Sequence, residues 1–304
     1  MEIFIQEEEP TQETKLITIS HSQYSMWSTC PLWWKLRYVD KLGKDDGIEA
    51  VFGTAMHETI QTWLKLLYEE APIKAKTFDL HEDLKERLKK LVPERLLSGE
   101  VPLTTKEEVT EFYIDGCNIL DHIRKYAKDL FPNNGYELVG VELPLEKDIH
   151  NNLKFKGYLD VVVFHKAAKI YYIYDFKTSR WGWTYQKKDV KKIDQLLLYK
   201  KFYSEIYGIP QDNIVAKFII LKRKLPENRD FVVKHISGFE PSQGKPSMNK
   251  STERFNNFIS QAFNPDGSHR LDNIKATPSE KNCKYCPFKN NKELCKFSFY
   301  KKRG

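Results

Sequence analysis

The chain has 304 residues, of which 40% are hydrophobic and 30% charged, so its composition excludes a disordered protein of low hydrophobicity. The length suits a single α/β domain with an elaboration. Lys and Arg exceed Asp and Glu by 49 to 42, and because the segment 1–15 is acidic, the remainder is more basic than the net charge of +7 indicates. This charge favours a polyanionic partner such as nucleic acid.

Compartment and membrane association follow from the hydrophobic pattern. No run reaches the roughly 18 consecutive apolar residues of a membrane span, and the start MEIFIQEEEP is acidic where a secretory signal is basic and then apolar. We therefore expect a cytoplasmic protein with no membrane contact. Five cysteines in such a chain indicate metal or cluster ligands rather than disulfides.

Helices are expected in the first half of the chain. After the flexible acidic tail 1–15, Ser20 or Ser22 is suited to cap a short helix that leads to Cys30 and an aromatic, basic helical run over 30–39. The run VFGTAMHETIQTWLKLLYEE has apolar residues at helical spacing and places His57 in the first turns of a long helix. Further amphipathic helices extend to residue 130, which predicts a helical insertion over 58–130.

The second half alternates strands and helices. Segments rich in β-branched and aromatic residues predict strands at 136–145, 153–165, 169–178, 214–222 and 231–239. A helix is expected over 189–207, and a last helix over 252–263 follows a polar loop at 240–251. Because no internal repeat is present, the simplest account is a single mixed α/β domain over 16–304.

Two acidic residues should meet on the hairpin formed by 153–165 and 169–178. If this hairpin is symmetric about residues 167 and 168, Asp160 faces Asp175, and opposed carboxylates need a cation between them. Side-chain alternation puts Lys177 on the same face as Asp175. A divalent metal with a lysine beside it is suited to phosphodiester hydrolysis. The alternative is an acid pair on a solvated face, but Ile173 and the VVV after Asp160 indicate buried strands.

Four motifs in this order resemble the PD-(D/E)XK nuclease superfamily, specifically its RecB-like branch: GTAMHE (53–58), GYLDVVV (157–163), YDFKTS (174–179) and QLLLY (195–199). The resemblance implies a restriction-endonuclease-like fold, with a mixed central sheet flanked by helices. It also implies that His57, Asp160, Asp175 and the Phe176 carbonyl bind the metal and that Lys177 is catalytic. Glu142 resembles an acid near the metals of some relatives, although it could equally be a surface residue.

Substrate contacts are expected on the helix 189–207 and after the catalytic strand. Gln195 and Tyr199 are four residues apart and share one helical face. The resemblance implies that this face contacts the substrate strand; otherwise it is simply solvated. Arg180 and Trp181 combine a cation with an aromatic ring, as single-stranded nucleic acid requires, and Trp183 is a further candidate.

The cysteines form a second constellation. Cys283 and Cys286 are spaced as a local chelate, and with Cys30 and Cys295 they fit either tetrahedral zinc or an iron–sulfur cluster, which spacing alone leaves open. Resemblance to AddB-type and CRISPR-adaptation nucleases implies a structural [4Fe-4S] cluster formed by Cys30 and the region 281–304. The gap before Cys295 is longer than in that pattern.

The resemblance implies a DNA nuclease that uses Mg²⁺ or Mn²⁺. We expect an exonuclease that acts from DNA ends, on single-stranded or end-containing DNA, in recombination, repair or replication. The alternatives are an endonuclease or flap nuclease, and a non-catalytic cluster-containing or zinc-stabilised DNA-binding subunit of a helicase–nuclease complex. Because no GxxxxGK[ST] phosphate loop is present, any helicase or recombination motor must be a separate partner.

Overall fold

The computed structural model describes residues 16–43, 47–70, 72–97, 103–150, 152–183, 189–226, 234–272 and 274–297. The acidic segment 1–15 and residues 298–304 of the expected cysteine region lie outside the described residues. Among the helices in these ranges, none has the length and apolar character needed to span a membrane.

A mixed sheet of six strands forms the centre of the molecule, in the order β1-β3-β4-β5-β6, with β2 paired to β3. Strands β1 and β3 run parallel, as do β4 and β5. The pairs β2–β3, β3–β4 and β5–β6 are antiparallel. The strands are β1 (Ile17–Ile19), β2 (Tyr136–His150), β3 (Leu153–His165), β4 (Ile170–Ser179), β5 (Ile214–Lys222) and β6 (Ile236–Phe239).

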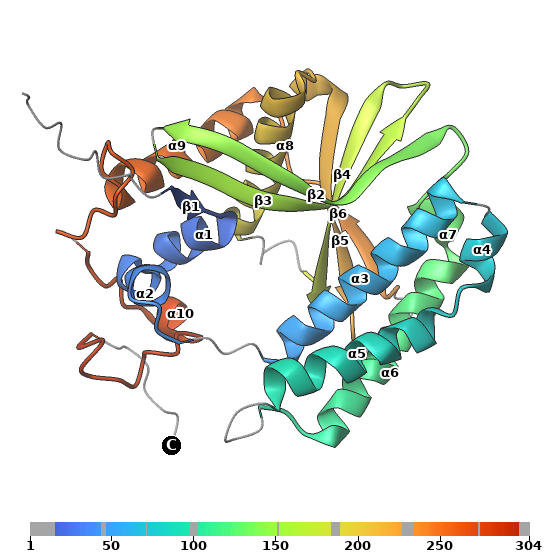
Figure 1. Cartoon of the computed structure of the whole chain (residues 1–304), viewed down its shortest axis with the longest axis horizontal. Helices are drawn as coiled ribbons and strands as arrows, with labels where there is room; N and C mark the ends of the chain where they lie inside the picture. Colours follow the sequence, from blue (N-terminus) through green and yellow to red (C-terminus); the bar gives the residue numbers. More distant parts are fainter. Residues whose placement is uncertain are drawn as a thin grey trace, which may run out of the picture.

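Helices cover both faces of this sheet (Figure 1). One hydrophobic core joins α3, α5 and α6 to one face, and a second joins α1, α8 and α9 to the other. The helices are α1 (His21–Thr29), α2 (Pro31–Trp34) with a π-helix (Lys35–Val39), α3 (Ile48–Glu69), α4 (Pro72–Thr77), α5 (Leu80–Leu96), α6 (Lys106–Lys125), α7 (Ala127–Leu130), α8 (Val190–Tyr207), a 3₁₀-helix (Gln211–Asn213), α9 (Lys245–Ala262) and α10 (Glu280–Cys283). The mixed α/β class that the sequence predicts is confirmed.

The hairpin of β3 and β4 has the register expected from the sequence. Val161 pairs with Tyr174 and Val162 with Ile173, so the next step along the register sets Asp160 opposite Asp175. On the other side of β3, the pairs Val141–Val161 and Leu143–Leu159 set Glu142 opposite Asp160 in the same way. Acidic residues of three neighbouring strands therefore stand in line across the sheet.

Two expected elements differ from the structure. Helix α9 begins at Lys245, seven residues before the expected start, because Gly244 is its N-cap and Pro246 stands in its first turn, where proline is tolerated. The polar loop expected over 240–251 is thus largely helical. Strand β6 begins at Ile236, and residues 231–233 of the expected strand lie outside the described residues.

Candidate metal centre

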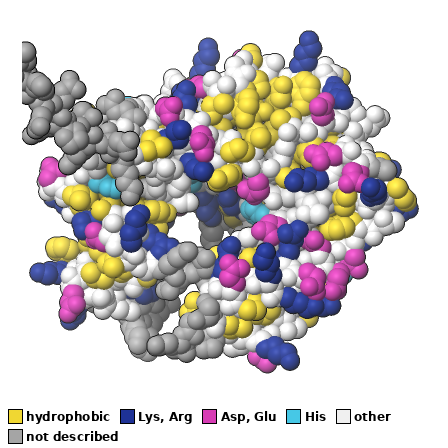
Figure 2. All heavy atoms as spheres, viewed as in Figure 1, with side chains coloured by type: hydrophobic (Ala, Val, Ile, Leu, Met, Phe, Trp, Pro, Cys, Tyr) yellow, Lys and Arg dark blue, Asp and Glu magenta, His cyan; other side chains and the backbone are white. Residues whose placement is uncertain are grey.

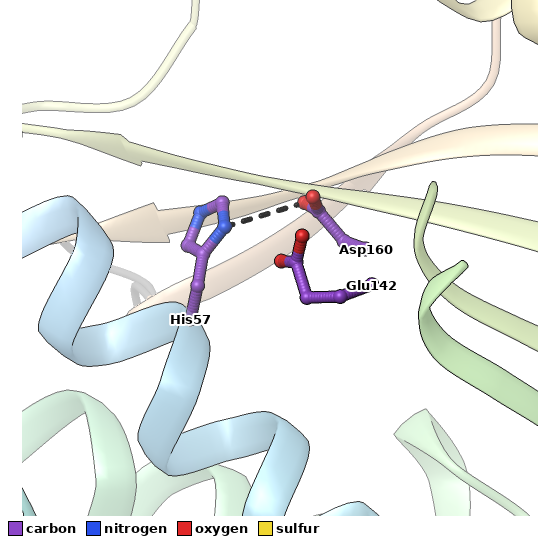
Figure 3. Close-up of side chains that lie close together, drawn as sticks. All are labelled: His57, Glu142 and Asp160. Carbon is purple, nitrogen blue, oxygen red and sulfur yellow. Dashed lines mark ion pairs between the residues drawn. The ribbon is translucent and has the colours of Figure 1, made fainter. Parts of the chain in front are cut away.

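Three side chains from separate elements converge at the middle of β3. One ligand atom each from His57, Glu142 and Asp160 lies within 4.8 Å of the others. His57 Nδ1 lies 3.4 Å from Asp160 Oδ2, and a dashed line joins the two side chains in Figure 3. An imidazole and two carboxylates are ligands that divalent cations accept, so this group can bind a metal ion.

Helix α3 supplies the candidate ligand His57 and also Gln61, which positions Glu142. Gln61 follows His57 by one helical turn and is 4% exposed. Its Nε2 donates to Glu142 Oε1 at 2.7 Å and to the Asp160 carbonyl at 3.2 Å. Glu142 has a φ of +47°, which a residue with a Cβ rarely adopts. Gln61 thus holds the strained backbone at Glu142 in place and keeps the Glu142 carboxylate beside Asp160. The sequence analysis did not identify Gln61, although its spacing from His57 was visible.

Asp175 is surrounded by polar partners on the other side of the centre. Lys177 Nζ lies 2.6 Å from Asp175 Oδ2, and Gln195 Nε2 donates to Asp175 Oδ1 at 3.0 Å. Gln195 Nε2 also lies 3.3 Å from the Tyr199 hydroxyl. Gln195 therefore orients the carboxylate, a contact that the sequence analysis did not foresee when it treated this helix face as a substrate contact.

The backbone of Phe176 joins the two halves of the centre. Its N–H donates to Asp160 Oδ2 at 2.7 Å, and the Phe176 ring centroid lies 5.8 Å from that of His57. The last regular pair of β3 and β4 is Val161–Tyr174. Beyond this pair, the side chain of Asp160 accepts the hydrogen bond that a backbone carbonyl would accept in a regular ladder. Phe176 therefore lies beside both Asp160 and His57.

Burial controls protonation in this centre. Together with the positive charge of Lys177, it lowers the pKa of His57 to about 4. Burial also raises the pKa values of Asp160 and Asp175 to about 6, against the opposing effect of Lys177. Burial acts to lower the pKa of Lys177, but Asp175 and Asp160 outweigh it and the pKa rises. At neutral pH the centre therefore has a neutral imidazole, ionised aspartates and a charged lysine.

The net charge of the centre favours a bound cation. At neutral pH three carboxylates, those of Glu142, Asp160 and Asp175, face one ammonium group, which leaves two net negative charges in a partly buried site. Moreover, Asp175 Oδ2 is buried and forms an ion pair with Lys177, but it accepts no hydrogen bond from the described residues. Buried charge of this kind is costly unless it is compensated. The donor set therefore fits a divalent cation.

A pocket of about 360 Å³ opens beside these carboxylates. Asp160, Asp175 and Lys177 line one side, and residues 18–23 of β1 and α1 line another. Gly157 lies between them, and a Cβ there would stand 3.0 Å from the Tyr199 ring. Glycine at this position therefore lets Tyr199 pack directly over β3.

A buried network fixes the α1 wall of this pocket. Asp194 on α8 is fully buried and accepts hydrogen bonds from Tyr24 at 2.6 Å and from Arg254 Nε at 2.8 Å. His21, at the start of α1, lies 2.7 Å through Nε2 from the carbonyl of Lys191. Ser20 caps α1 by accepting from the N–H of Gln23, as one of the two expected caps. These contacts hold α1 against α8 and α9.

Two other groups expected from the sequence lie apart from the pocket. Arg180 and Trp181 follow β4, where the guanidinium lies 5.6 Å from the ring centroid and Trp181 is 57% exposed, but neither lines the pocket. Trp183 instead packs against the ring of Phe218.

The four cysteines expected to bind a cluster are not among the closely grouped metal ligands of the described residues. Within the described ranges, the group of His57, Glu142 and Asp160 is the one set of candidate metal ligands whose atoms all lie within 4.8 Å. The expected iron–sulfur ligands Cys30, Cys283, Cys286 and Cys295 do not form such a set, and all are free thiols. The cluster expected from the sequence is therefore not supported by this arrangement.

Comparison with known families gives one match. The family model described as the PD-(D/E)XK nuclease superfamily matches residues 18–291. That range includes every residue of the centre. A search of curated proteins finds no match to this chain.

Proposed function

Because the chain belongs to the PD-(D/E)XK nuclease superfamily, whose members use divalent metals, we propose that it is a deoxyribonuclease that hydrolyses phosphodiester bonds with Mg²⁺ or Mn²⁺. The observation that carries the proposal is the line of acidic residues across β2, β3 and β4, with a lysine at its end. A solvated surface pair would not need the buried partners that Asp160 and Asp175 have.

Metal binding is assigned to His57, Asp160, Asp175 and the Phe176 carbonyl. Glu142 joins this set, since it lies in the same ligand group as His57 and Asp160. Neutral imidazole is the form of histidine that binds metals, and the low pKa of His57 keeps it in that form. A cation bound here polarises the phosphate and lowers the pKa of a coordinated water.

The protein's own groups supply positioning and charge. Lys177 lies at the pocket, where its ammonium can orient the attacking water or stabilise negative charge on the phosphate oxygens. Gln195 and Tyr199 hold the Asp175 carboxylate in place. On this proposal Asp160, Asp175 and Lys177 are the catalytic residues, and Arg180 and Trp181 contact the nucleic acid beyond the pocket.

DNA ends are the proposed point of attack. The net charge of +7 favours a polyanion, and Figure 2 shows the molecule hollowed between α1 and α2 on one side and α3 and α5 on the other, with Lys and Arg side chains at the rim. A strand that enters such a hollow from its end would be cut progressively. We therefore favour an exonuclease of recombination, repair or replication, working beside a separate helicase or recombination protein.

Labelled linear, end-blocked and circular DNA separate this function from its alternatives. With Mg²⁺ or Mn²⁺ the protein should degrade linear DNA, leave circles intact and lose all activity in EDTA. Rapid cutting of circles would show an endonuclease, and cutting at branched junctions alone would show a flap nuclease. Binding without cleavage under every metal would favour the non-catalytic subunit.

We also propose that Cys30, Cys283, Cys286 and Cys295 hold a [4Fe-4S] cluster. In support, burial and, to a smaller extent, the other three thiols raise the pKa of the Cys286 thiol to about 11, so the four groups are close enough to affect one another. Tetrahedral zinc with Zn–S bonds of about 2.3 Å is the alternative for the same four thiolates.

Metal analysis of protein purified without oxygen tests the cluster. About four irons per chain and a brown colour are expected, both lost in Cys286→Ser. Cys117→Ser is the matched control, because Cys117 lies on α6, and it should retain the iron. Colourless protein that contains zinc would contradict the cluster.

A further inference from the structure

An exposed aromatic ring stands beside the catalytic pocket with no role in the centre described above. We propose that Tyr158, supported by Lys156, is a stacking subsite for one unpaired nucleobase next to the phosphate that is cut. The inference rests on the proposed nuclease function and deepens it, because it commits the site to a substrate strand that is unpaired at the point of cleavage.

The open edge of β3 is the first observation. Strand β2 occupies one edge of β3 along its length, so β1 and β4 must share the other edge. On that edge β1 pairs with residues 153–155 and β4 with residues 161–165. Residues 156–160 have no strand partner there among the described elements. The pocket lies along this interruption, and its lining includes Lys156, Gly157, Tyr158 and Asp160.

The geometry of the strand links the ring to the chemistry. Tyr158 precedes Asp160 by two residues on β3, with Cα atoms about 6.6 Å apart, and both line the pocket. Tyr158 is 44% exposed although it is large and apolar. A nucleotide whose phosphate lies at Asp160 would therefore find an open ring face next to it.

A cation accompanies the ring. Lys156 Nζ lies 5.7 Å from the centroid of the Tyr158 ring and 3.2 Å from Glu146 Oε1, which fixes the ammonium. Aromatic rings combined with cations are the means by which proteins hold single strands without reading their sequence, since every base has a face that stacks. The chemistry predicts tolerance of all four bases.

The size of the pocket suits one nucleotide. At about 360 Å³ it is at the small end of the range of roughly 300–1,000 Å³ for ligand pockets, and the β1–α1 segment and Tyr199 wall it on either side. A single nucleotide suits a space of this size. A base in duplex DNA would first have to leave its stack, at a cost of about a few kcal/mol.

Binding of a labelled single-stranded oligothymidylate in EDTA tests the subsite apart from cleavage. Tyr158→Ala should weaken binding by about 5- to 150-fold, the value of one stacked base, whereas Tyr158→Phe should keep wild-type affinity. Tyr207→Ala is the matched control, because Tyr207 is 47% exposed at the end of α8, and its affinity should be unchanged. Blunt duplex should bind equally to all three variants and the wild type.

An abasic site introduced along the oligonucleotide adds a second readout. At one position it should weaken binding to the wild type and have no effect on Tyr158→Ala. Equal affinity of Tyr158→Ala and wild type, or damage by Tyr158→Phe as large as by Tyr158→Ala, would overturn the subsite. Failure of the wild type to cut any nucleic acid with Mg²⁺ or Mn²⁺ would overturn the nuclease function instead, and the EDTA binding result would still decide the subsite.

Discussion

Replacing Gln61 with leucine should weaken metal binding without touching a metal ligand. The substitution keeps the bulk of the side chain but removes the donors to Glu142 Oε1 and to the Asp160 carbonyl. Glu142 is then free to leave its strained backbone conformation at a φ of +47°, and its carboxylate no longer faces His57 and Asp160.

The size of the effect follows from the role of Gln61. Groups that orient metal ligands are worth about 10- to 100-fold in affinity. At a Mn²⁺ concentration of about 100 times the wild-type Kd, binding stabilises the folded protein by about 2.7 kcal/mol. In Gln61→Leu the same concentration should provide only about 0.4 to 1.4 kcal/mol.

Urea unfolding with and without Mn²⁺ and calorimetric titration of Mn²⁺ measure this difference. Thr59→Val is the matched control, because Thr59 is also fully buried on α3 and donates to Asp83 at 2.8 Å, away from the centre. It should lose stability yet keep the full gain from Mn²⁺. If Gln61→Leu retains wild-type Mn²⁺ affinity, the reasoning about its positioning role is refuted.

Two further predictions concern charge. Lys177→Met should lower the cleavage rate by about 10²- to 10³-fold while Mn²⁺ still binds, and cleavage at the wild-type rate would contradict the role of the ammonium. Burial lowers the pKa of His21 to about 4, below its unfolded value near 6.5, so the unfolded chain takes up the proton first. Stability should be complete above about pH 6.5 and fall towards pH 4, by about 2 kcal/mol at pH 5. His21→Gln should lose this part of the pH dependence in urea unfolding, and an unchanged dependence would contradict it.

The hairpin at the centre could be predicted from sequence because its cause is local. Symmetry about residues 167 and 168 and the period of two along a strand set the register, and Val161 pairs with Tyr174 as expected. The helical period likewise predicted α3 and α8, and the structure adds Asp189 as the N-cap of α8. Such features depend on residues close together in the chain.

The features that sequence reasoning missed depend on distant contacts or unusual backbone. Gln61 and Glu142 are 81 residues apart, and the sequence around residue 142 does not predict a positive φ there. The pocket wall formed by residues 18–23 requires Asp194 to hold α1 through Tyr24 and Arg254. The cysteine cluster stays a prediction, because the described sulfurs are not among the ligand groups whose atoms all lie within 4.8 Å of one another.

Cleavage of labelled linear DNA by the wild type and by Asp160→Asn, titrated with Mn²⁺ and then with EDTA, tests the central claim most directly. Asp160 accepts the hydrogen bond from Phe176 and lies between Glu142 and Asp175, and asparagine keeps its shape while removing the charge. The account predicts Mn²⁺-dependent cleavage by the wild type, none in EDTA and none by a folded Asp160→Asn. Cleavage in EDTA, or by Asp160→Asn at the wild-type rate, would contradict it.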